Sequence, residues 1–253
     1  NVDLRILFSP EHGFQGKLDQ QRADHAIHVP TGPRTHSLYT SDHNPNHETL
    51  QGLETLVFDI QDIGTRIYTY ASTLAYCMEE AAAAGIPIVV LDRPNPIGGI
   101  AVSGPVLDEK LRSFVGYATI PVRHGMTIGE LALYFNGELA IGADLTVIGL
   151  VGWHREMWFD QTGLEWINPS PNMREPRQAL LYPALGPLEW TNISVGRGTA
   201  EPFEWFGAPW IDGADLAAAL EDIGYSGDLA DVAADGDNRH GRACGAAPRV
   251  WAP

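Results

Sequence analysis

The sequence predicts an α/β fold in which a mostly parallel sheet carries helices on both faces. Apolar runs that are typical of buried parallel strands occur at Leu4–Phe8, Leu56–Ile60, Ile86–Leu91 and Leu145–Ile148. Helical patterns alternate with these runs along the first part of the chain. Strand–helix–strand alternation at this spacing requires crossover connections, which join parallel strands and place helices against the sheet.

The two helices of this alternation are marked by their apolar spacing and by their ends. The segment Thr69–Ala84 places apolar residues on one helical face, and Gly85 follows it as a stop signal. The segment Ile128–Leu139 is preceded by Thr127, an N-cap residue, with Glu130 at the position that completes a capping box. We therefore expect helices with these bounds.

Two long stretches interrupt the alternation. Gln15–Glu48 is polar and rich in His, Pro and Asn, whereas Arg93–Val115 is rich in Pro and Gly. We expect both to be irregular loops, and loops of this length in a compact domain are usually functional or mobile. After Leu150 the pattern weakens, and helices are expected near Arg177–Leu181 and Ala214–Ile223.

These changes in pattern predict three regions in the chain. We expect an α/β domain over residues 1–150, an aromatic-rich continuation over 151–226 that begins a partial, smaller C-terminal region, and a poorly ordered tail over 227–253. The sequence starts at Asn1, almost directly inside a predicted strand. We therefore interpret the chain as a fragment, in which a missing signal peptide says nothing about the compartment.

Composition excludes several classes of protein. The formal net charge is −16, and phosphate neutralisation needs basic surface, so we expect no nucleic-acid partner. No run is long and apolar enough to cross a bilayer. Cys77 and Cys244 provide neither a disulfide framework nor metal-ligand spacing. No GxGxxG pattern follows a strand, so we expect no nicotinamide or flavin cofactor, and none of another kind.

Acidic residues lie at or just after the end of each of the first three predicted strands. In chain order they are Glu11, then Asp59 and Asp62, then Asp92. If these strands are neighbours, the carboxylates converge at the edge of the sheet where α/β proteins bind ligands. Paired carboxylates across a cleft are the groups that hydrolyse glycosides. The alternative is that these acids cap helices or pair with Arg66 and Arg93.

Two further groups of side chains suit ligands of other kinds. Arg123 and His124 precede the second predicted helix, whose N-terminus favours an anionic group. The first long loop is crowded with histidines, which leaves a metal-dependent hydrolase as an alternative. They are His25, His28, His36, His43 and His47, with Asp24 and Glu48 nearby. Because no HExxH or comparable helical spacing occurs among them, we expect no metal site.

A set of motifs in a fixed order gives the chain a specific resemblance. They are SPEHGF (Ser9–Phe14), VFDIQDIGTRIYTY (Val57–Tyr70), LDRPNP (Leu91–Pro96), PVRHGMT (Pro121–Thr127), SPNM (Ser170–Met173), LEWTN (Leu188–Asn192) and GRGT (Gly196–Thr199). With these motifs the chain resembles the bacterial DUF1343 family, which is associated with exo-acting β-N-acetylmuramidases of the NamZ type. The resemblance covers about residues 4–212.

The resemblance implies a Rossmann-like N-terminal domain and hydrolysis of terminal β-linked N-acetylmuramic acid from peptidoglycan fragments. It makes Glu11 the general acid or base, and Asp62 our choice for the second catalytic carboxylate, with Asp92 and Glu189 as other candidates. The expected substrate-binding residues are His12, Gln61, Arg66, Asp92, Arg93, Asn95, Arg123, His124, Asn172, Glu189, Asn192 and Arg197. Among them we infer that Arg66, Arg123 and Arg197 could hold the lactyl carboxylate of muramic acid.

The same resemblance implies a hydrolase of bacterial cell-wall recycling that is periplasmic or secreted and whose partner is a peptidoglycan-derived saccharide. A non-catalytic module that binds peptidoglycan or sugar remains the alternative. The sequence does not choose between retention and inversion at the sugar carbon, and it makes no prediction of oligomeric state.

Overall fold

The structure is a computed structural model that describes residues 3–13, 16–17, 33–39 and 43–222. The chain divides into two compact units, Asn1–Pro176 and Arg177–Pro253, which are described separately here. Residues 151–176, which the sequence pattern assigned to the second region, cluster with the first unit. The tail expected over 227–253 lies outside the described residues.

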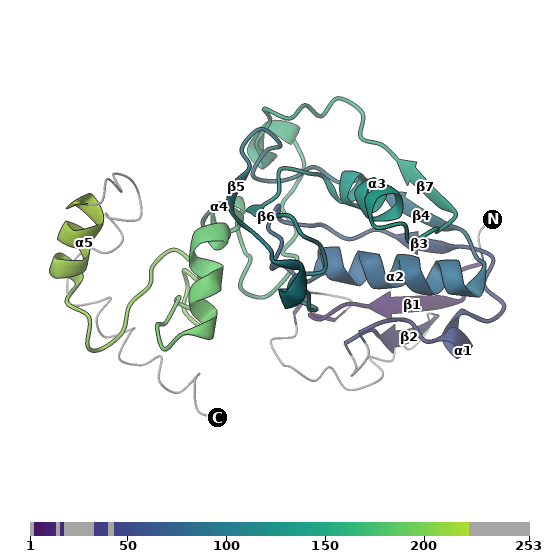
Figure 1. Ribbon diagram of the computed structural model, residues 1–253, viewed down its shortest axis with the longest axis horizontal. Helices are drawn as coiled ribbons and strands as arrows, with labels where there is room; N and C mark the ends of the chain where they lie inside the picture. Colours follow the sequence, from purple (N-terminus) through teal and green to yellow (C-terminus); the bar gives the residue numbers. More distant parts are fainter. Residues whose placement is uncertain (1–2, 14–15, 18–32, 40–42, 223–253) are drawn as a thin grey trace. The chain divides into compact units, whose positions relative to one another are not determined.

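Three parallel strands form the central sheet of the first unit (Figure 1). In spatial order they are β3 (Leu56–Phe58), β4 (Ile88–Leu91) and β7 (Leu145–Ile148). Ile88 of the middle strand pairs with Leu56 on one side and with Leu145 on the other. These strands lie within or coincide with three of the four predicted apolar runs, so the predicted parallel α/β class is confirmed.

The two helices between these strands begin and end close to the predicted residues. Helix α2 (Tyr70–Ala84) ends at Gly85, whose N–H donates to the carbonyls of the last turn. Helix α3 (Ile128–Glu138) opens with the predicted capping box, in which the Thr127 side chain accepts from the N–H of Glu130 and the Glu130 side chain accepts from the N–H of Thr127. The local end signals therefore predicted both helices correctly.

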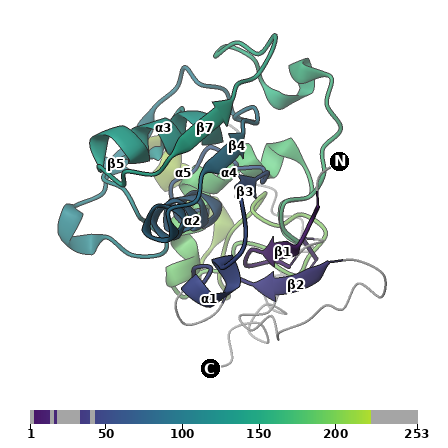
Figure 2. The same cartoon turned by 90° about the vertical axis from the view of Figure 1, so that its right-hand side faces the viewer.

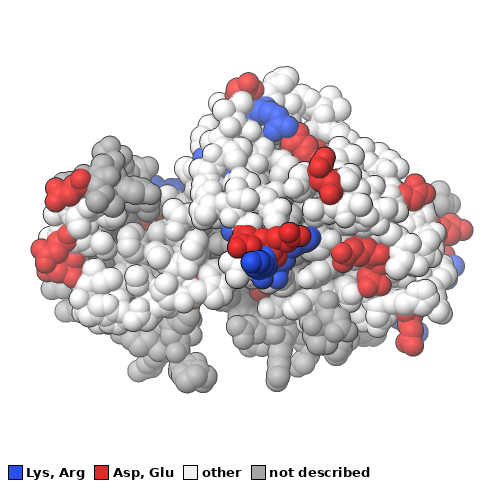
Figure 3. Space-filling view, viewed as in Figure 1, with Lys and Arg blue, Asp and Glu red and all other residues white. Residues whose placement is uncertain are grey.

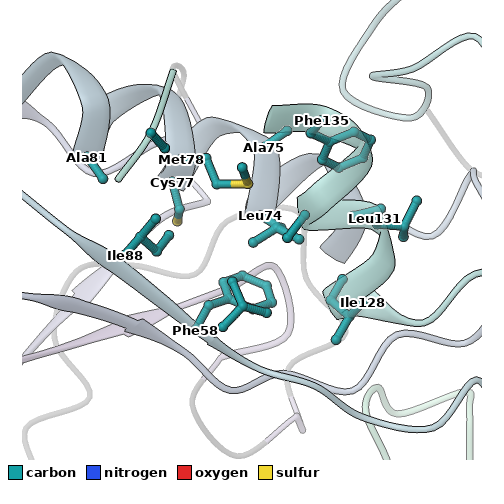
Figure 4. Close-up of a cluster of buried hydrophobic side chains, with 14 of the residues drawn as sticks. Phe58, Leu74, Ala75, Cys77, Met78, Ala81, Ile88, Ile128, Leu131 and Phe135 are labelled. Atoms are coloured by element: carbon teal, nitrogen blue, oxygen red, sulfur yellow. The ribbon is translucent and has the colours of Figure 1, made fainter. Parts of the chain in front are cut away.

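The core of the first unit lies between the central sheet and these two helices (Figure 4). Labelled members of this core are Phe58, Leu74, Ala75, Cys77, Met78, Ala81, Ile88, Ile128, Leu131 and Phe135. Helices α2 and α3 lie on the same side of the three strands (Figure 2). On the opposite face of the sheet, Val57 and Ile148 are 56% and 52% exposed.

Helices α2 and α3 both cover the same face of this sheet. The strand order β3-β4-β7 is also the order of these strands along the chain, so both crossovers run in the same direction across the sheet. Right-handed crossovers that run in the same direction place their helices on the same face.

Two more strand pairs include segments that the sequence predicted as irregular. Strand β1 (Ile6–Ser9) pairs in parallel with β2 (Arg34–Ser37), and β5 (Ser103–Val106) pairs antiparallel with β6 (Pro121–Arg123). Strands β2 and β5 lie inside the expected loops, so that prediction was wrong at these positions. The sequence of β2, Arg-Thr-His-Ser, has no apolar run, and a short strand of this kind is held by its backbone partners rather than by its own pattern.

The remaining elements are short or belong to the end of the described chain. They are α1 (His47–Leu50), η1 (Glu109–Leu111), η2 (Phe159–Thr162), α4 (Pro176–Leu185), η3 (Gly186–Trp190) and α5 (Gly213–Asp222). Helices α4 and α5 confirm the two helices expected late in the sequence. None of the described helices combines the length and the apolar character that crossing a membrane requires.

Candidate active site

Glu11 lies in the turn that follows strand β1. The N–H of Gly13 donates to the carbonyl of Pro10 at 3.0 Å, and the N–H of Gly16 donates to the carbonyl of Gly13 at 3.1 Å. Two consecutive turns therefore follow Ser9, the last residue of the strand. The carboxylate stands at the carboxyl end of a parallel strand, which is the edge where α/β proteins bind ligands.

The side chain of Glu11 is held by Thr69, at the start of helix α2. Thr69 Oγ1 donates to Oε2 of Glu11 at 2.7 Å. Thr69 is the N-cap residue of α2, yet its side chain makes no capping hydrogen bond. N-cap hydroxyls normally accept from a free N–H of the first turn. Here the hydroxyl is instead directed at Glu11, a carboxylate placed near the positive end of the helix dipole.

Aromatic side chains complete the surroundings of Glu11. Burial, together with the charge of Glu11 and a hydrogen bond to it, raises the pKa of Tyr39. Burial also raises the pKa of Tyr70, whose hydroxyl donates to the carbonyl of Pro169 at 2.6 Å. The ring of His12 meets the ring of Tyr70 at 6.3 Å between centroids. The phenol groups of Tyr39 and Tyr70 therefore keep their protons at neutral pH and act as hydrogen-bond donors.

Asp62 and His124 form a buried pair, and each is 3% exposed. Oδ2 of Asp62 accepts from the N–H of Gly64 at 2.7 Å and lies 3.3 Å from Nε2 of His124. The N–H of Met126 donates to Nδ1 of His124 at 3.1 Å, so the proton of a neutral imidazole belongs on Nε2, toward Asp62. The structure thus brings two of the predicted residues together.

Asp92 and Arg93 make contacts of the kind given by the alternative interpretation of the acids, in which they cap helices or pair with arginines. Asp92 accepts from the hydroxyl of Thr127 at 3.0 Å and from the N–H of Gly129 at 2.7 Å, at the N-terminus of α3. Arg93 pairs with Asp59 at 2.6 Å. These contacts give Asp92 and Arg93 a structural role. Their role in substrate binding stays a prediction.

Two of the predicted amides of the first unit, Gln61 and Asn95, donate to backbone carbonyls. Gln61 Nε2 donates to the carbonyl of Pro94 at 2.9 Å, and Asn95 Nδ2 donates to that of Met126 at 2.9 Å. Asn172 is buried.

Two guanidinium groups are also directed at backbone carbonyls. Arg66 donates to Pro105 and Ile120, while Arg123 donates to Ile97 and lies over the ring of Trp158. Burial lowers the pKa of both arginines.

The second unit holds the last three predicted residues. Arg197 pairs with Glu189 at 2.6 Å, and the hydroxyl of Tyr182 donates to the same carboxylate at 3.3 Å. Asn192 is exposed. Within this unit the structure brings Glu189 and Arg197 together, and the roles of all three in substrate binding stay predictions.

The described histidines of the first long loop lie against aromatic rings or at a helix start. His36 meets Phe8 edge-on, His43 stacks on Phe114 at 3.9 Å between centroids, and His47 begins α1. In the part of the chain that the structure describes, no three His, Cys, Asp or Glu side chains are grouped to hold a metal ion. His25 and His28 lie outside those residues.

Sequence reasoning missed two side chains of this site, Thr69 and Tyr39. The sequence marks Thr69 only as the start of a predicted helix, and Tyr39 lies in a stretch that the sequence predicts as an irregular loop. The absence of a capping-box partner three residues after Thr69 was the one available sign that its hydroxyl has another use.

The fold and the site together define an α/β protein with a candidate catalytic carboxylate at the end of a parallel strand. Comparison with known families then identifies the kind of α/β protein. The family profile "Exo-beta-N-acetylmuramidase NamZ, N-terminal" matches residues 1–177, and its C-terminal counterpart matches residues 180–233. The chain therefore belongs to the NamZ exo-β-N-acetylmuramidase family, as its motifs predicted.

Individual relatives agree with this assignment. The chain is 49% identical over 230 residues to the peptidoglycan β-N-acetylmuramidase NamZ of Bacillus subtilis (strain 168), a match that covers 90% of this chain and 55% of that protein. A crystal structure of a DUF1343 family protein from Bacteroides fragilis NCTC 9343 matches with a TM-score of 0.80 and 42% identity, over 88% of this chain and 57% of that one. A second from the same organism has a TM-score of 0.69 and 37% identity, over 82% and 55%. The chain thus spans little more than half the length of these relatives.

Proposed function

We propose that this protein is a glycosidase that releases terminal β-linked N-acetylmuramic acid from peptidoglycan fragments, with Glu11 as its general acid or base. The observation that carries the proposal is the position of Glu11, at the carboxyl end of β1 with its carboxylate bound by Thr69. This residue lies inside the region that matches the NamZ N-terminal profile. The Bacillus relative named for the same reaction supports the choice of substrate.

Most glycosidases use one group that protonates the leaving oxygen and a second carboxyl group that acts as base or nucleophile, whereas in some the acetamido group of the substrate is the nucleophile. We assign the role of general acid or base to Glu11 and keep Asp62 as the proposed second group. Oδ1 of Asp62 is buried and has no hydrogen-bond partner among the described residues. A buried polar atom of this kind needs an explanation, and a catalytic role of Asp62 would supply one.

The charge of the protein supports a saccharide partner over a nucleic acid. On the face drawn in Figure 3, basic side chains are few, and those in the middle of it lie against acidic ones. Such a surface offers no continuous basic stripe for phosphates. Because the proposed substrate derives from peptidoglycan, we propose that the working protein is periplasmic or secreted.

The experiment that tests the function is incubation of the purified protein with a nitrophenyl β-glycoside of N-acetylmuramic acid. Release of nitrophenol and of muramic acid supports the proposal. Binding of the glycoside without turnover would replace it by the sugar-binding module. Turnover that disappears with a chelator and returns with a divalent metal would replace it by the metal-dependent hydrolase.

A further inference from the structure

A hollow of about 320 Å³ lies next to the turns that carry Glu11. It is lined by Gly16, Lys17, Ile167, Asn168 and Pro171. Gly16 has a φ of +63°, and a Cβ atom there would lie 2.8 Å from the carbonyl oxygen of Asn168. Only glycine allows the two segments to approach this closely. The close contact between these two segments forms one wall of the hollow. Lys17, the residue after Gly16, is one of the residues that line it.

Two series of contacts connect the hollow to the turn that carries Glu11. The N–H of Gly16 donates to the carbonyl of Gly13, in the turn that contains Glu11. On the other side, the hydroxyl of Tyr70 donates to Pro169, between the lining residues Asn168 and Pro171. Tyr70 in turn contacts His12, the neighbour of Glu11. The hollow therefore lies beside the turn that carries Glu11.

Lys17 is the cation among the described residues that line this hollow, while the arginines first expected to bind an anion are engaged elsewhere. Arg66 and Arg123 donate to backbone carbonyls, and Arg197 pairs with Glu189. The side chain of Lys17 is exposed, and it has no hydrogen-bond or ion-pair partner among the described residues. An ammonium group on a flexible stem can reach a carboxylate as a point charge.

We propose that the hollow binds the lactyl carboxylate of N-acetylmuramic acid through Lys17, an inference that rests on the proposed function. The lactyl group carries a methyl beside its carboxylate, and Ile167, which is 76% exposed, supplies an apolar lining for it. N-acetylglucosamine lacks the lactyl group. Lys17 thus selects muramic acid over glucosamine, and it replaces the three arginines as the residue that recognises the anion.

The test compares the two lysines of the chain, Lys17 and Lys110, in the variants Lys17→Met and Lys110→Met. Lys110 lies in the exposed turn η1 and serves as the matched control. For the nitrophenyl β-glycoside of N-acetylmuramic acid, we expect Lys17→Met to lower kcat/KM by about 10- to 100-fold, as for the loss of a charged hydrogen bond. Lys110→Met should leave kcat/KM unchanged, and Lys17→Arg should recover most of the loss because it keeps the charge.

A calorimetric titration with free N-acetylmuramic acid and with N-acetylglucosamine separates this inference from the proposed function. We expect Lys17→Met to weaken binding of the first sugar and leave binding of the second unchanged. If the wild-type protein binds muramic acid but does not hydrolyse its glycoside, the proposed function is wrong. The titration then still measures how much Lys17 contributes to binding of muramic acid. If the wild-type protein is active and Lys17→Met keeps the full preference for muramic acid, the role of Lys17 is wrong and the function stands.

Discussion

Thr69 donates its hydroxyl proton to the carboxylate of Glu11 over 2.7 Å, from the N-cap position of helix α2. The bond joins the end of strand β1 to the start of the longest described helix. A carboxylate held in this way is oriented before any substrate arrives, and such preorganisation is what a catalytic group needs.

Removing this hydroxyl should slow catalysis without unfolding the protein. We expect Thr69→Val to lower kcat by about 10- to 100-fold because Glu11 loses its fixed orientation, with little change in KM. Thr69→Ser should restore most of the rate. The matched control is Thr73→Val, which removes a hydroxyl one turn further along α2 that donates to the carbonyl of Thr69. Equal rates for the Thr69→Val and wild-type proteins would show that the hydroxyl does not position Glu11.

The turn after Asp62 should tolerate no side chain at Gly64. A Cβ atom there would lie 2.4 Å from Oδ1 of Asn95 and 2.7 Å from Cγ1 of Ile97, at a φ of +82°. Gly85 has a similar φ of +68° with nothing within 4 Å, so Gly85→Ala measures the backbone strain alone, about 1–2 kcal/mol. We expect Gly64→Ala to lower the free energy of unfolding by about 1–3 kcal/mol more, through overpacking. Urea denaturation of both variants gives this difference, and equal losses would contradict the packing around Asp62.

Cys77 should make the stability of the first unit depend on alkaline pH. Burial raises the pKa of its thiol from 9.0 to about 12, with a smaller contribution from the charge of Glu80. In the unfolded chain the thiol loses its proton near pH 9, whereas in the folded protein it keeps it to about pH 12. The folded state thus binds more protons in this window, and its stability falls as the pH rises from about 9 to 12.

Two measurements check this prediction. Denaturation between pH 9 and 12 should show a smaller loss of stability in Cys77→Ala than in the wild-type protein, because the variant lacks the titrating thiol. In a Cys244→Ser background, Cys77 should be inert to a thiol reagent at pH 8 in the native state and react fully in guanidinium chloride. Rapid reaction of the native protein would mean that Cys77 is not buried.

The parts of the fold that were predictable are those whose information is local. The capping box of Thr127 and Glu130 marked the start of α3, and the apolar run Leu145–Ile148 coincides with β7. Strand β2 could not be found in this way, because its residues are polar and its partner β1 lies 28 positions away in the paired register, from Ile6 to Arg34. Backbone pairing over such a separation leaves no periodic pattern in the sequence.

The site was predictable only in part for a similar reason. Position after a strand indicated Glu11, Asp62 and Asp92 alike, but it did not show that Asp92 accepts hydrogen bonds at the start of α3 while Glu11 faces Thr69. Lys17 had no motif to mark it. Its place in a lined hollow depends on the approach of Gly16 to Asn168, two residues far apart in the sequence.

The most direct test of the whole account is the rate at which the wild-type and Glu11→Gln proteins release N-acetylmuramic acid from its nitrophenyl β-glycoside. Glutamine keeps the size and the hydrogen bond to Thr69 but neither gives nor takes the catalytic proton. We expect the variant to be at least about 100-fold slower, with an unchanged midpoint of thermal unfolding. A folded Glu11→Gln protein that releases muramic acid at the wild-type rate would show that Glu11 is not the catalytic carboxylate.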